Sequence, residues 1–287
     1  MREAMFWRPS QGGDRKVRCF LCPHGCEIPP DGFGLCRARK NVGGKLYAVN
    51  YGEVTAAALD PLEKKPLKNY LPGKYVFSLG TFGCNLACGF CQNWTIAHGE
   101  NPPSSFLSPG KAVALAQELL PQGNIGLAFT YSEPLMWYEY VRDTAQAAQK
   151  AGLKNILVTN GYINPKPLRE LLPFIDAVNL DIKAYTEGFY NDVCKGKLAP
   201  VLTSAKLFFE ACHLEVTTLI IPGFNDNPEE IRSLARWLAG INPHIPLHLS
   251  RYFPNYKFDA PPTPRQTMER AAKAAGEYLH NVYLGNI

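Results

Sequence analysis

The sequence predicts an α/β protein, built as a partial barrel of strands and helices and preceded by a small cysteine-rich extension. Three observations support this prediction. From residue 75 onward, short apolar runs alternate with helix-length segments. The runs are typical of strands buried on both faces, which indicates a parallel sheet with right-handed helical crossovers. The first 74 residues do not follow this period.

Six apolar runs rich in β-branched residues are the expected barrel strands. They cover residues 75–80, 124–131, 154–160, 176–183, 213–221 and 245–252. A further strand is expected at 281–285, "NVYLG", just before the last residues. Six units are too few for a closed eight-stranded barrel, so we predict a partial (β/α)6 TIM-like barrel. Its functional residues should lie at the carboxyl ends of the strands.

The segments between these runs are expected to be helices. They cover residues 108–120, 133–152, 164–172, 199–212, 227–240 and 263–280. Several begin with Ser or Asn followed by Pro, which is typical of an N-cap and first turn. Two end at a glycine, Gly152 and Gly240, a common helix stop.

The segment before the barrel contains four cysteines, followed by "KLYAVN" and "EVTAAAL". These are two expected short strands joined through Tyr51 and Gly52. The stretch "LPGK" at 71–74 marks the expected boundary. We therefore predict a cysteine-rich N-terminal region over 1–74 and a barrel over 75–287.

The composition is that of an ordinary globular protein, with 46% hydrophobic and 19% charged residues. No apolar run approaches the length of a membrane span, and the first residues lack the apolar core of a secretory signal. We therefore expect a cytoplasmic protein. The net charge is only +5, and the densest basic patch, 63–70, has three lysines. A solvated loop is favoured there over a nucleic-acid site.

Seven of the nine cysteines fall into two groups. In a cytoplasmic chain, such groups are more often ligands or catalysts than disulfides. The second group, Cys84-x3-Cys88-x2-Cys91, directly follows the first barrel strand. Structural zinc takes four protein ligands, whereas a four-iron cluster held by three cysteinates leaves one iron open to a substrate. Gly83 and Gly89 should let this loop wrap tightly.

This C-x3-C-x2-C loop, with Phe90 before its third cysteine, resembles that of the radical SAM superfamily. In that superfamily the open iron chelates the amino and carboxylate groups of S-adenosylmethionine (SAM), and one electron breaks the sulfonium bond. The resemblance implies that Cys84, Cys88 and Cys91 are catalytic ligands of a [4Fe-4S] cluster. It also implies a reductant such as flavodoxin or ferredoxin. The alternatives are an iron–sulfur electron-transfer protein and a zinc loop.

The second expected strand ends in "TYSEP", where the superfamily has a Gly-Gly-Glu-Pro stretch around the methionine amino group. Ser132, Glu133 and Pro134 match that stretch, whereas Tyr131 replaces a glycine. Glu133 is the expected acceptor for the SAM ammonium group, since an ammonium needs a carboxylate or carbonyl beside it. The alternative is a carboxylate that only complements a helix N-terminus.

Later strand ends, "VTNGY", "LDIK" and "PLHLSRY", resemble those of glycyl-radical activating enzymes, whose matching residues contact SAM. The resemblance carries over Thr159, Asn160, Asp181, Lys183 and His248. His248 alone could equally be a core residue. Two positions depart from the activating enzymes, because Val158 stands where they carry an acidic residue and Thr217 where they carry an arginine.

Over nearly the whole chain, from "CFLCPHGCEIPPDGFGLCRARKN" to "HLSRYFPNY", the sequence resembles the AmmeMemoRadiSam-system radical SAM enzymes. These are relatives of the pyruvate formate-lyase activating enzyme. The resemblance implies hydrogen abstraction from a protein or small-molecule substrate, but it does not identify that substrate. A non-catalytic scaffold that uses both cysteine groups to bind metal is the alternative.

The first group, Cys19-x2-Cys22-x3-Cys26-x9-Cys36, has enough thiols for a tetrahedral zinc site or a second iron–sulfur cluster. The sequence leaves the choice open, and four free structural cysteines are a further alternative. Arg37 and Arg39 lie close enough in sequence to offset surplus negative charge. The two remaining cysteines, Cys194 and Cys212, are expected to be structural thiols, although Cys194 follows a strand end and could contact a substrate.

Overall fold

The computed structural model describes residues 1–12, 14–100 and 102–287. Its central element is an eight-stranded sheet in the order β16-β15-β14-β13-β12-β11-β9-β8. All neighbours pair in parallel except β8, which runs antiparallel to β9. The strands are β8 (Ala56–Pro61), β9 (Tyr75–Gly80), β11 (Asn124–Phe129), β12 (Lys154–Thr159), β13 (Ala177–Asp181), β14 (His213–Ile220), β15 (Leu247–Arg251) and β16 (Val282–Gly285). The seven predicted barrel strands are confirmed.

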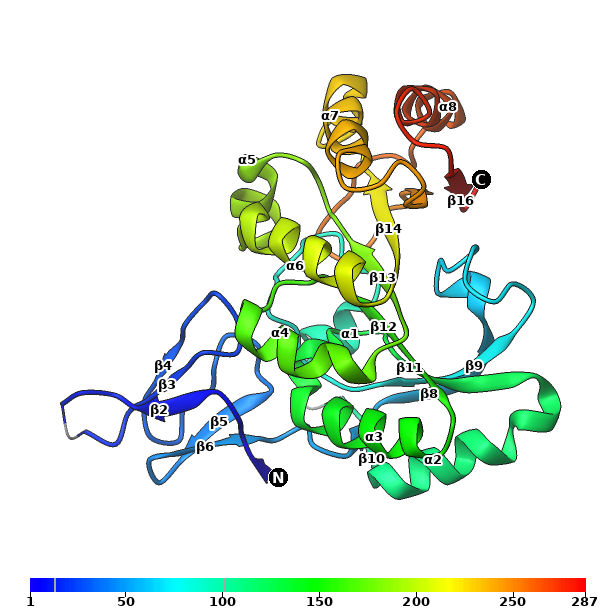
Figure 1. Cartoon of the computed structure of the whole chain (residues 1–287). Coiled ribbons are helices and arrows are strands. Elements are labelled where there is room, and N and C mark those ends of the chain that lie inside the picture. Colours follow the sequence, from blue (N-terminus) through cyan, green and yellow to red (C-terminus); the bar gives the residue numbers. More distant parts are fainter. Residues whose placement is uncertain (13, 101) are drawn as a thin grey trace.

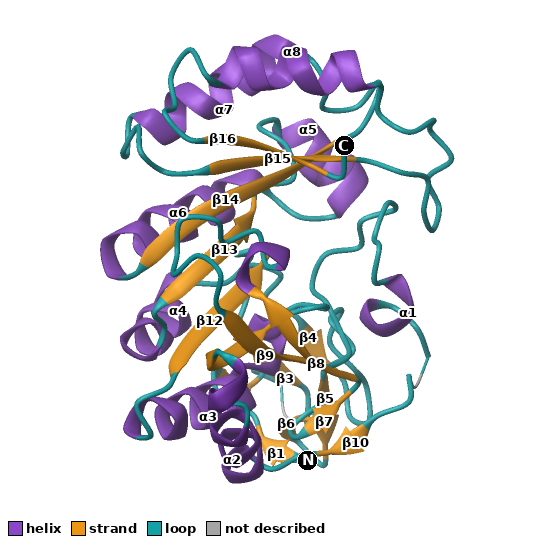
Figure 2. Ribbon diagram, turned by 90° about the vertical axis from the view of Figure 1, so that its right-hand side faces the viewer, coloured by secondary structure: helices purple, strands orange, loops and turns teal. Residues whose placement is uncertain are grey.

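Helices follow the parallel strands and cover the outer face of the curved sheet (Figures 1 and 2). They are α2 (Pro109–Glu118), α3 (Tyr138–Lys150), α4 (Pro165–Leu171), α6 (Leu198–Ala211), α7 (Pro228–Ala239) and α8 (Arg265–Ala275). The Ser108 and Asn227 side chains cap α2 and α7, as their sequences predict. The helix expected from 133 instead opens with a 3-10 turn, Pro134–Trp137, and α3 begins only at Tyr138.

The core lies between this sheet and its helices. Strand side chains such as Leu127, Leu157, Val178 and Val216 are fully buried, as expected of strands covered on both faces. Burial of each such side chain contributes about 1.5–3 kcal/mol of transfer free energy. Within the described residues, no helix combines the length and apolar character needed to cross a membrane.

The N-terminal segment forms two small antiparallel sheets beside the barrel (Figure 1). One contains β1 (Arg2–Glu3), β6 (Lys45–Ala48) and β5 (Arg39–Val42), and the other contains β2 (Trp7–Pro9), β3 (Val17–Cys19) and β4 (Glu27–Ile28). The strand expected over "EVTAAAL" is divided. Its first part, β7 (Glu53–Val54), pairs with β10 (Ser105–Phe106), whereas its second part is β8.

Strand β8 protects the edge of β9 by hydrogen-bonding along all six of its residues. The barrel sheet therefore begins before residue 74. The division of the chain into an N-terminal region, 1–74, and a barrel, 75–287, stays a prediction.

Candidate active site at the mouth of the barrel

The loop after β9 carries Cys84, Cys88 and Cys91 at the carboxyl edge of the sheet. Its entry requires glycine, because Gly83 has φ +95° and a Cβ there would lie 2.6 Å from the carbonyl oxygen of Cys36. Gly89 is packed against the ring of Phe258, only 2.7 Å from where a Cβ would stand. Close packing therefore holds the loop on both sides.

The protein surroundings by themselves make the three thiols of this loop poor acids. Burial raises the pKa of Cys84 and of Cys91, and for Cys88 a hydrogen bond from its thiol to Cys194 raises the pKa together with burial. The Lys183 cation acts in the opposite direction on Cys88 and Cys91. A bound metal would supply the additional positive charge that thiolates need, as it does at cysteine sites generally.

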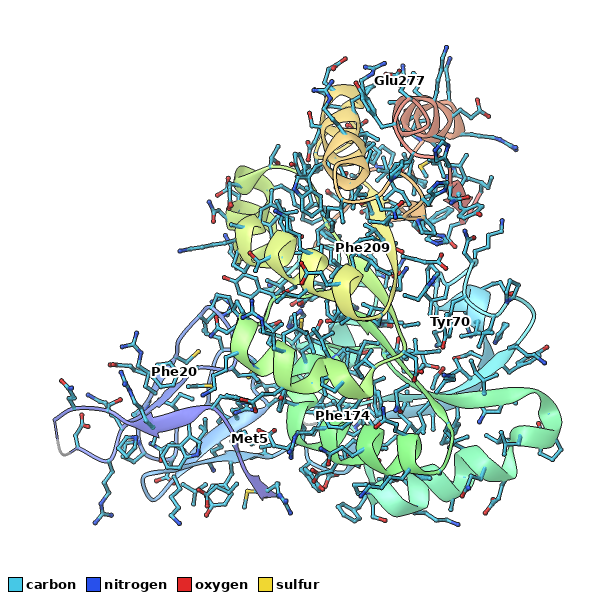
Figure 3. All side chains as sticks on the ribbon, viewed as in Figure 1. Met5, Phe20, Tyr70, Phe174, Phe209 and Glu277 are labelled. Carbon is cyan, nitrogen blue, oxygen red and sulfur yellow. The ribbon has the colours of Figure 1, made fainter. Side chains whose placement is uncertain are left out.

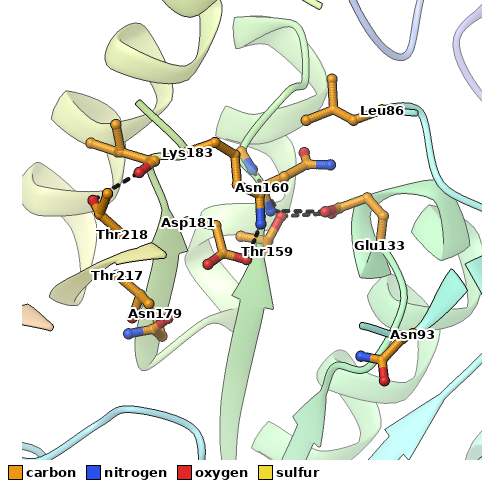
Figure 4. Close-up of polar contacts among 12 residues, drawn as sticks. Leu86, Asn93, Glu133, Thr159, Asn160, Asn179, Asp181, Lys183, Thr217 and Thr218 are labelled. Atoms are coloured by element: carbon orange, nitrogen blue, oxygen red, sulfur yellow. Dashed lines mark hydrogen bonds and ion pairs between the residues drawn. The ribbon is translucent and has the colours of Figure 1, made fainter. Parts of the chain in front are cut away.

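Glu133, in the turn after β11, is buried against the carboxyl end of β12. Its carboxylate accepts hydrogen bonds from the Thr159 hydroxyl (2.6 Å) and the Asn160 backbone N–H (2.8 Å) (Figure 4). It also accepts from the Leu135 backbone N–H at 3.0 Å. Burial raises the pKa of Glu133 to about 7 even though these hydrogen bonds lower it. The carboxylate is thus fixed in place but needs a cation beside it to stay ionised at neutral pH.

The turn before Glu133 has a backbone conformation that glycine normally adopts, although Tyr131 stands at that position. Tyr131 adopts φ +70°, in the left-handed region that favours glycine. Its hydroxyl donates to Asp60 at 2.7 Å, and its carbonyl oxygen accepts from Asn93 at 2.6 Å, so both ends are held. The next hydroxyl, that of Ser132, is buried and has no partner among the described residues. A buried, unsatisfied hydroxyl beside Glu133 fits a site that is completed by a polar ligand.

Asn160 connects these strand ends to the cysteine loop. Its side-chain amide lies 3.7 Å from the Cys84 sulfur and donates to Oδ1 of Asn85 at 3.1 Å. Its backbone N–H contacts Glu133 at the same time. The structure therefore brings together Glu133, Thr159, Asn160 and Cys84.

Asp181 is the last residue of β13, Lys183 lies two residues after it, and the two form an ion pair of 2.8 Å. Burial disfavours the Lys183 cation, but the Asp181 carboxylate outweighs burial and raises the pKa of Lys183. The backbone of Lys183 is also fixed, because its N–H donates to the Tyr190 hydroxyl and its carbonyl oxygen accepts from Asn225. A permanent, oriented cation thus faces Cys88 and Cys91.

His248 lies at the same level of the barrel as Asp181, since both pair in register with Thr217. Its Nε2 is 2.6 Å from the Glu215 carboxylate, one layer closer to the amino ends of the strands. Thr217 donates to Oδ1 of Asn179 at 2.9 Å. Contact of His248 with a ligand stays a prediction.

The sequence of this protein matches the family described as "Radical SAM superfamily" over residues 78–238, more than half of the chain. The chain belongs to the radical SAM superfamily. The superfamily uses a [4Fe-4S] cluster and SAM, which are therefore the cofactors of this radical SAM protein.

Two relatives are similar in sequence to this radical SAM protein over most of its length. An uncharacterised protein of Methanocaldococcus jannaschii is 42% identical over 295 residues, spanning 100% of this chain and 86% of the relative. Pyruvate formate-lyase 1-activating enzyme of Escherichia coli K12 is 24% identical over 218 residues, spanning 70% of this chain and 88% of that enzyme. Among solved structures, Streptococcus suis SuiB bound to S-adenosylmethionine shares the fold. It has a TM-score of 0.58 and 14% identity over 73% of this chain and 51% of SuiB.

The thiols that the structure describes in this radical SAM protein are not gathered as a site for a single ion. Within the described ranges, no three His, Cys, Asp or Glu side chains lie close enough together to hold one metal ion. A four-iron cluster binds each thiolate to a different iron, so its ligand sulfurs stand farther apart than those around zinc. The buried Ser132 hydroxyl and the Glu133 carboxylate beside the loop fit the polar end of SAM.

Some residues at the mouth of the barrel have contacts that the sequence did not predict. Cys194 lies in a π-helical turn, Tyr190–Cys194, and its carbonyl oxygen accepts from the backbone N–H of Ala87, directly before Cys88, at 2.8 Å. Such turns occur often at functional sites, although a lone cysteine in a loop gives no signal for this contact. Asn85 was also missed, and its position directly after Cys84 was the available signal. Phe90 is buried between the rings of Phe189 and Phe258.

Proposed function

We propose that this protein cleaves SAM with one electron and uses the resulting radical to abstract hydrogen from a substrate, as glycyl-radical activating enzymes do. The observation that supports this most strongly is the convergence of Glu133, Thr159 and Asn160 on Cys84. Together with Cys84 these groups come from three different strand ends, those of β9, β11 and β12, yet hydrogen bonds link them to one another. Such preorganisation favours binding of a ligand in one orientation.

In this proposal Cys84, Cys88 and Cys91 hold the catalytic cluster. When bound, the cluster supplies the electron that divides SAM into methionine and a 5′-deoxyadenosyl radical. The protein's task is to keep the thiolates ionised and in place. Lys183 lowers the pKa of Cys88 and Cys91, and Asn160 donates a hydrogen bond to the Cys84 sulfur.

The same residues would orient SAM. The Glu133 carboxylate and the Ser132 hydroxyl would receive the ammonium group of its methionine end, with Pro134 fixing the turn. Lys183, already ionised beside Asp181, would pair with the SAM carboxylate. Thr159 would act through Glu133 by holding its carboxylate. Phe90 and His248 complete the proposed site. Phe90 would pack beneath the cysteine loop, and His248, at the same level of the barrel as Asp181, would contact SAM.

A protein substrate is favoured by the relatives. Besides the pyruvate formate-lyase 1-activating enzyme, an isethionate sulfite-lyase activating enzyme of Oleidesulfovibrio alaskensis is 26% identical over 117 residues, 40% of this chain and 38% of that enzyme. By this analogy the substrate is a glycine in a partner protein, and a small molecule is the second possibility. The proposal includes a flavodoxin or ferredoxin as electron donor and a cytoplasmic location.

The test is the reductive cleavage of SAM. Anaerobically reconstituted protein, reduced with dithionite, should convert SAM to 5′-deoxyadenosine and methionine, which chromatography separates. The Cys84→Ala, Cys88→Ala, Cys91→Ala triple variant should form neither product and should lose the cluster signal that responds to SAM. If wild type with an intact cluster forms no 5′-deoxyadenosine, with or without candidate partner proteins, the non-catalytic scaffold is the correct interpretation.

A further inference from the structure

A small cavity lies where the N-terminal region meets the cysteine loop of the barrel. All four cysteines of the first group line it, together with Arg39, Asn85 and Met136. Three of these cysteines, Cys19, Cys22 and Cys36, are buried. The cavity volume is about 10 Å³, just enough for one water-sized sphere. Four thiols from separate turns thus converge on a space that no described side chain fills.

The arrangement of these thiols bears on the group that the cavity would hold. A zinc ion binds its sulfur ligands at about 2.3 Å, so it needs several thiols gathered around one point. Among the described residues, no three potential ligands are gathered closely enough to hold one ion. The same is true of the Cys84 loop, where the superfamily binds its cluster. The first cysteine group therefore resembles the cluster-binding loop in this respect, and a cluster accommodates a wider set of thiols than zinc does.

Arg39 provides a second, independent observation. Its side chain is 1% exposed, with Nη1 donating to the Met5 carbonyl oxygen at 2.7 Å and Nη2 to Glu139 at 2.6 Å. Its Nε is buried without a partner among the described residues, although Arg39 lines the cavity. Figure 3 shows Met5 at this junction between the N-terminal strands and the barrel. Oε2 of Glu139 is also buried without a partner in the described part of the chain, so the Arg39–Glu139 pair leaves one donor and one acceptor unsatisfied. A sulfur atom in the cavity would supply an acceptor for Nε.

The wall between the cavity and the catalytic loop is thin. Asn85, which lines the cavity, directly follows Cys84, and its carbonyl oxygen lies 2.7 Å from Nε2 of His24. On the same side, Gly83 packs against the carbonyl oxygen of Cys36. The two cysteine groups therefore share one packed wall of backbone.

We propose that Cys19, Cys22, Cys26 and Cys36 hold a second [4Fe-4S] cluster, and that Nε of Arg39 donates a hydrogen bond to one of its sulfur atoms. Four cysteinates give this cluster a full set of protein ligands, so it has no open iron for SAM. Arg39 contributes positive charge in the cavity and lowers the free energy of the anionic sulfur atoms. Donors to cluster sulfurs also set the reduction potential, so Arg39 should control the potential of this cluster.

The test uses the full-length Cys84→Ala, Cys88→Ala, Cys91→Ala variant, in which any iron must be held elsewhere. After anaerobic purification it should contain about four iron and four acid-labile sulfide per chain, half of the wild-type iron, with little zinc. One zinc per chain without sulfide, or no metal in a variant whose circular dichroism is that of wild type, would overturn the proposal.

If that variant does not fold, reduced wild type answers the same question by electron paramagnetic resonance. Two cluster signals are expected, of which SAM changes only one. A single signal, wholly sensitive to SAM, would contradict a second cluster.

The role of Arg39 is tested by Arg39→Lys in the same triple variant. Iron content should be kept, while the midpoint potential and the resonance signal of the remaining cluster shift. Arg37→Lys is the matched control, because Arg37 is exposed and donates to the carbonyl oxygen of His98. An Arg39→Lys signal identical to that of the control would exclude the hydrogen bond to the cluster.

Discussion

Thr159, the last residue of β12, donates a 2.6 Å hydrogen bond to the carboxylate of Glu133, which follows β11 and is 26 positions away in the chain. The contact is buried, and the Asn160 N–H holds the second carboxylate oxygen at 2.8 Å. A carboxylate that is desolvated and oriented before a ligand arrives costs little further entropy when a cation binds. Its protonation state is then the main variable of the site.

The affinity for SAM should depend on pH through Glu133. Burial raises the pKa of Glu133 to about 7 from its ordinary value of 4.5, so this group carries a proton below pH 7. A protonated carboxyl does not attract the SAM ammonium, and affinity should therefore fall up to about tenfold for each pH unit below 7. Isothermal titration of cluster-loaded protein with SAM between about pH 5.5 and 8, a range of about 2.5 units, measures this dependence.

Glu133→Gln is the control, because glutamine keeps the shape but does not titrate. It should weaken SAM binding about tenfold at pH 8 and show no dependence on Glu133 ionisation. Lys183 and the Cys84 thiol also act on Glu133, so Glu133→Gln identifies which group titrates. Equal pH slopes in the two proteins would contradict the assignment. In the ligand-free protein the sign is opposite: since ionisation is disfavoured by burial, stability should decrease as pH rises from 4.5 to 7.

Substitution of Asp181 or Lys183 should affect different properties. Lys183→Ala should act mainly on SAM affinity, since the cation is proposed to pair with the SAM carboxylate. Asp181→Ala should keep the cluster but lose most 5′-deoxyadenosine formation, by about a hundredfold, because Lys183 loses the partner that positions it at 2.8 Å. Product yield and SAM affinity are measured on the same samples. A loss of affinity in Asp181→Ala alone would contradict this division.

Gly83→Ala should destabilise the protein and disturb both cysteine groups. Alanine at φ +95° is strained, and its Cβ would lie 2.6 Å from the Cys36 carbonyl oxygen, which is backbone and cannot move alone. We expect a loss of about 2–4 kcal/mol in the free energy of unfolding. The matched control is Gly73→Ala, since Gly73 has φ +76° but no atom within 4 Å of the added Cβ. It should cost only about 1 kcal/mol.

Equal losses in chemical denaturation of these two variants would show that backbone strain alone matters at Gly83. Iron content adds a second measurement. It should fall in Gly83→Ala and stay unchanged in Gly73→Ala.

Glu215→Gln should destabilise the base of the barrel. Its buried carboxylate accepts from His213, His248 and the backbone N–H groups of Lys68 and Asn69. Glutamine has one acceptor oxygen, so we expect a loss of about 2–4 kcal/mol in unfolding free energy. The exposed Glu210→Gln control should change stability by less than about 0.5 kcal/mol.

The stabilisation by Glu215 should also depend on pH. Burial alone would raise the pKa of Glu215, but the hydrogen bonds from His213 and His248 outweigh burial and lower it to about 2. The stability difference between wild type and Glu215→Gln should therefore be complete above pH 4.5 and shrink as pH falls toward 2. A difference that does not change over this range would contradict a shifted pKa.

Much of the barrel and of its cysteine loop could be predicted from the sequence, because both depend on local patterns. Apolar runs followed by Ser-Pro or Asn-Pro helix starts predict strands and helices in order, and parallel pairing follows from the crossovers. The triplet Cys84, Cys88 and Cys91 is a local motif, so the superfamily could also be predicted. Glu133, Thr159 and Asn160 could be named only through resemblance, since no pairing rule links residues on different strand ends.

The remaining features depend on contacts between segments that are distant in sequence. Arg39 meets Glu139 at a separation of 100 residues, and only this packing leaves Nε of Arg39 without an acceptor. Likewise, Cys194 reaches Cys88 only because a π-helical turn carries it back over the barrel mouth. The sequence by itself therefore determined which elements form and which thiols are available as ligands, because propensity and spacing are local properties. Only the tertiary structure decided that the first four thiols line one cavity beside the buried Arg39. That convergence depends on how the N-terminal sheets pack against the loop from Gly83 to Asn85.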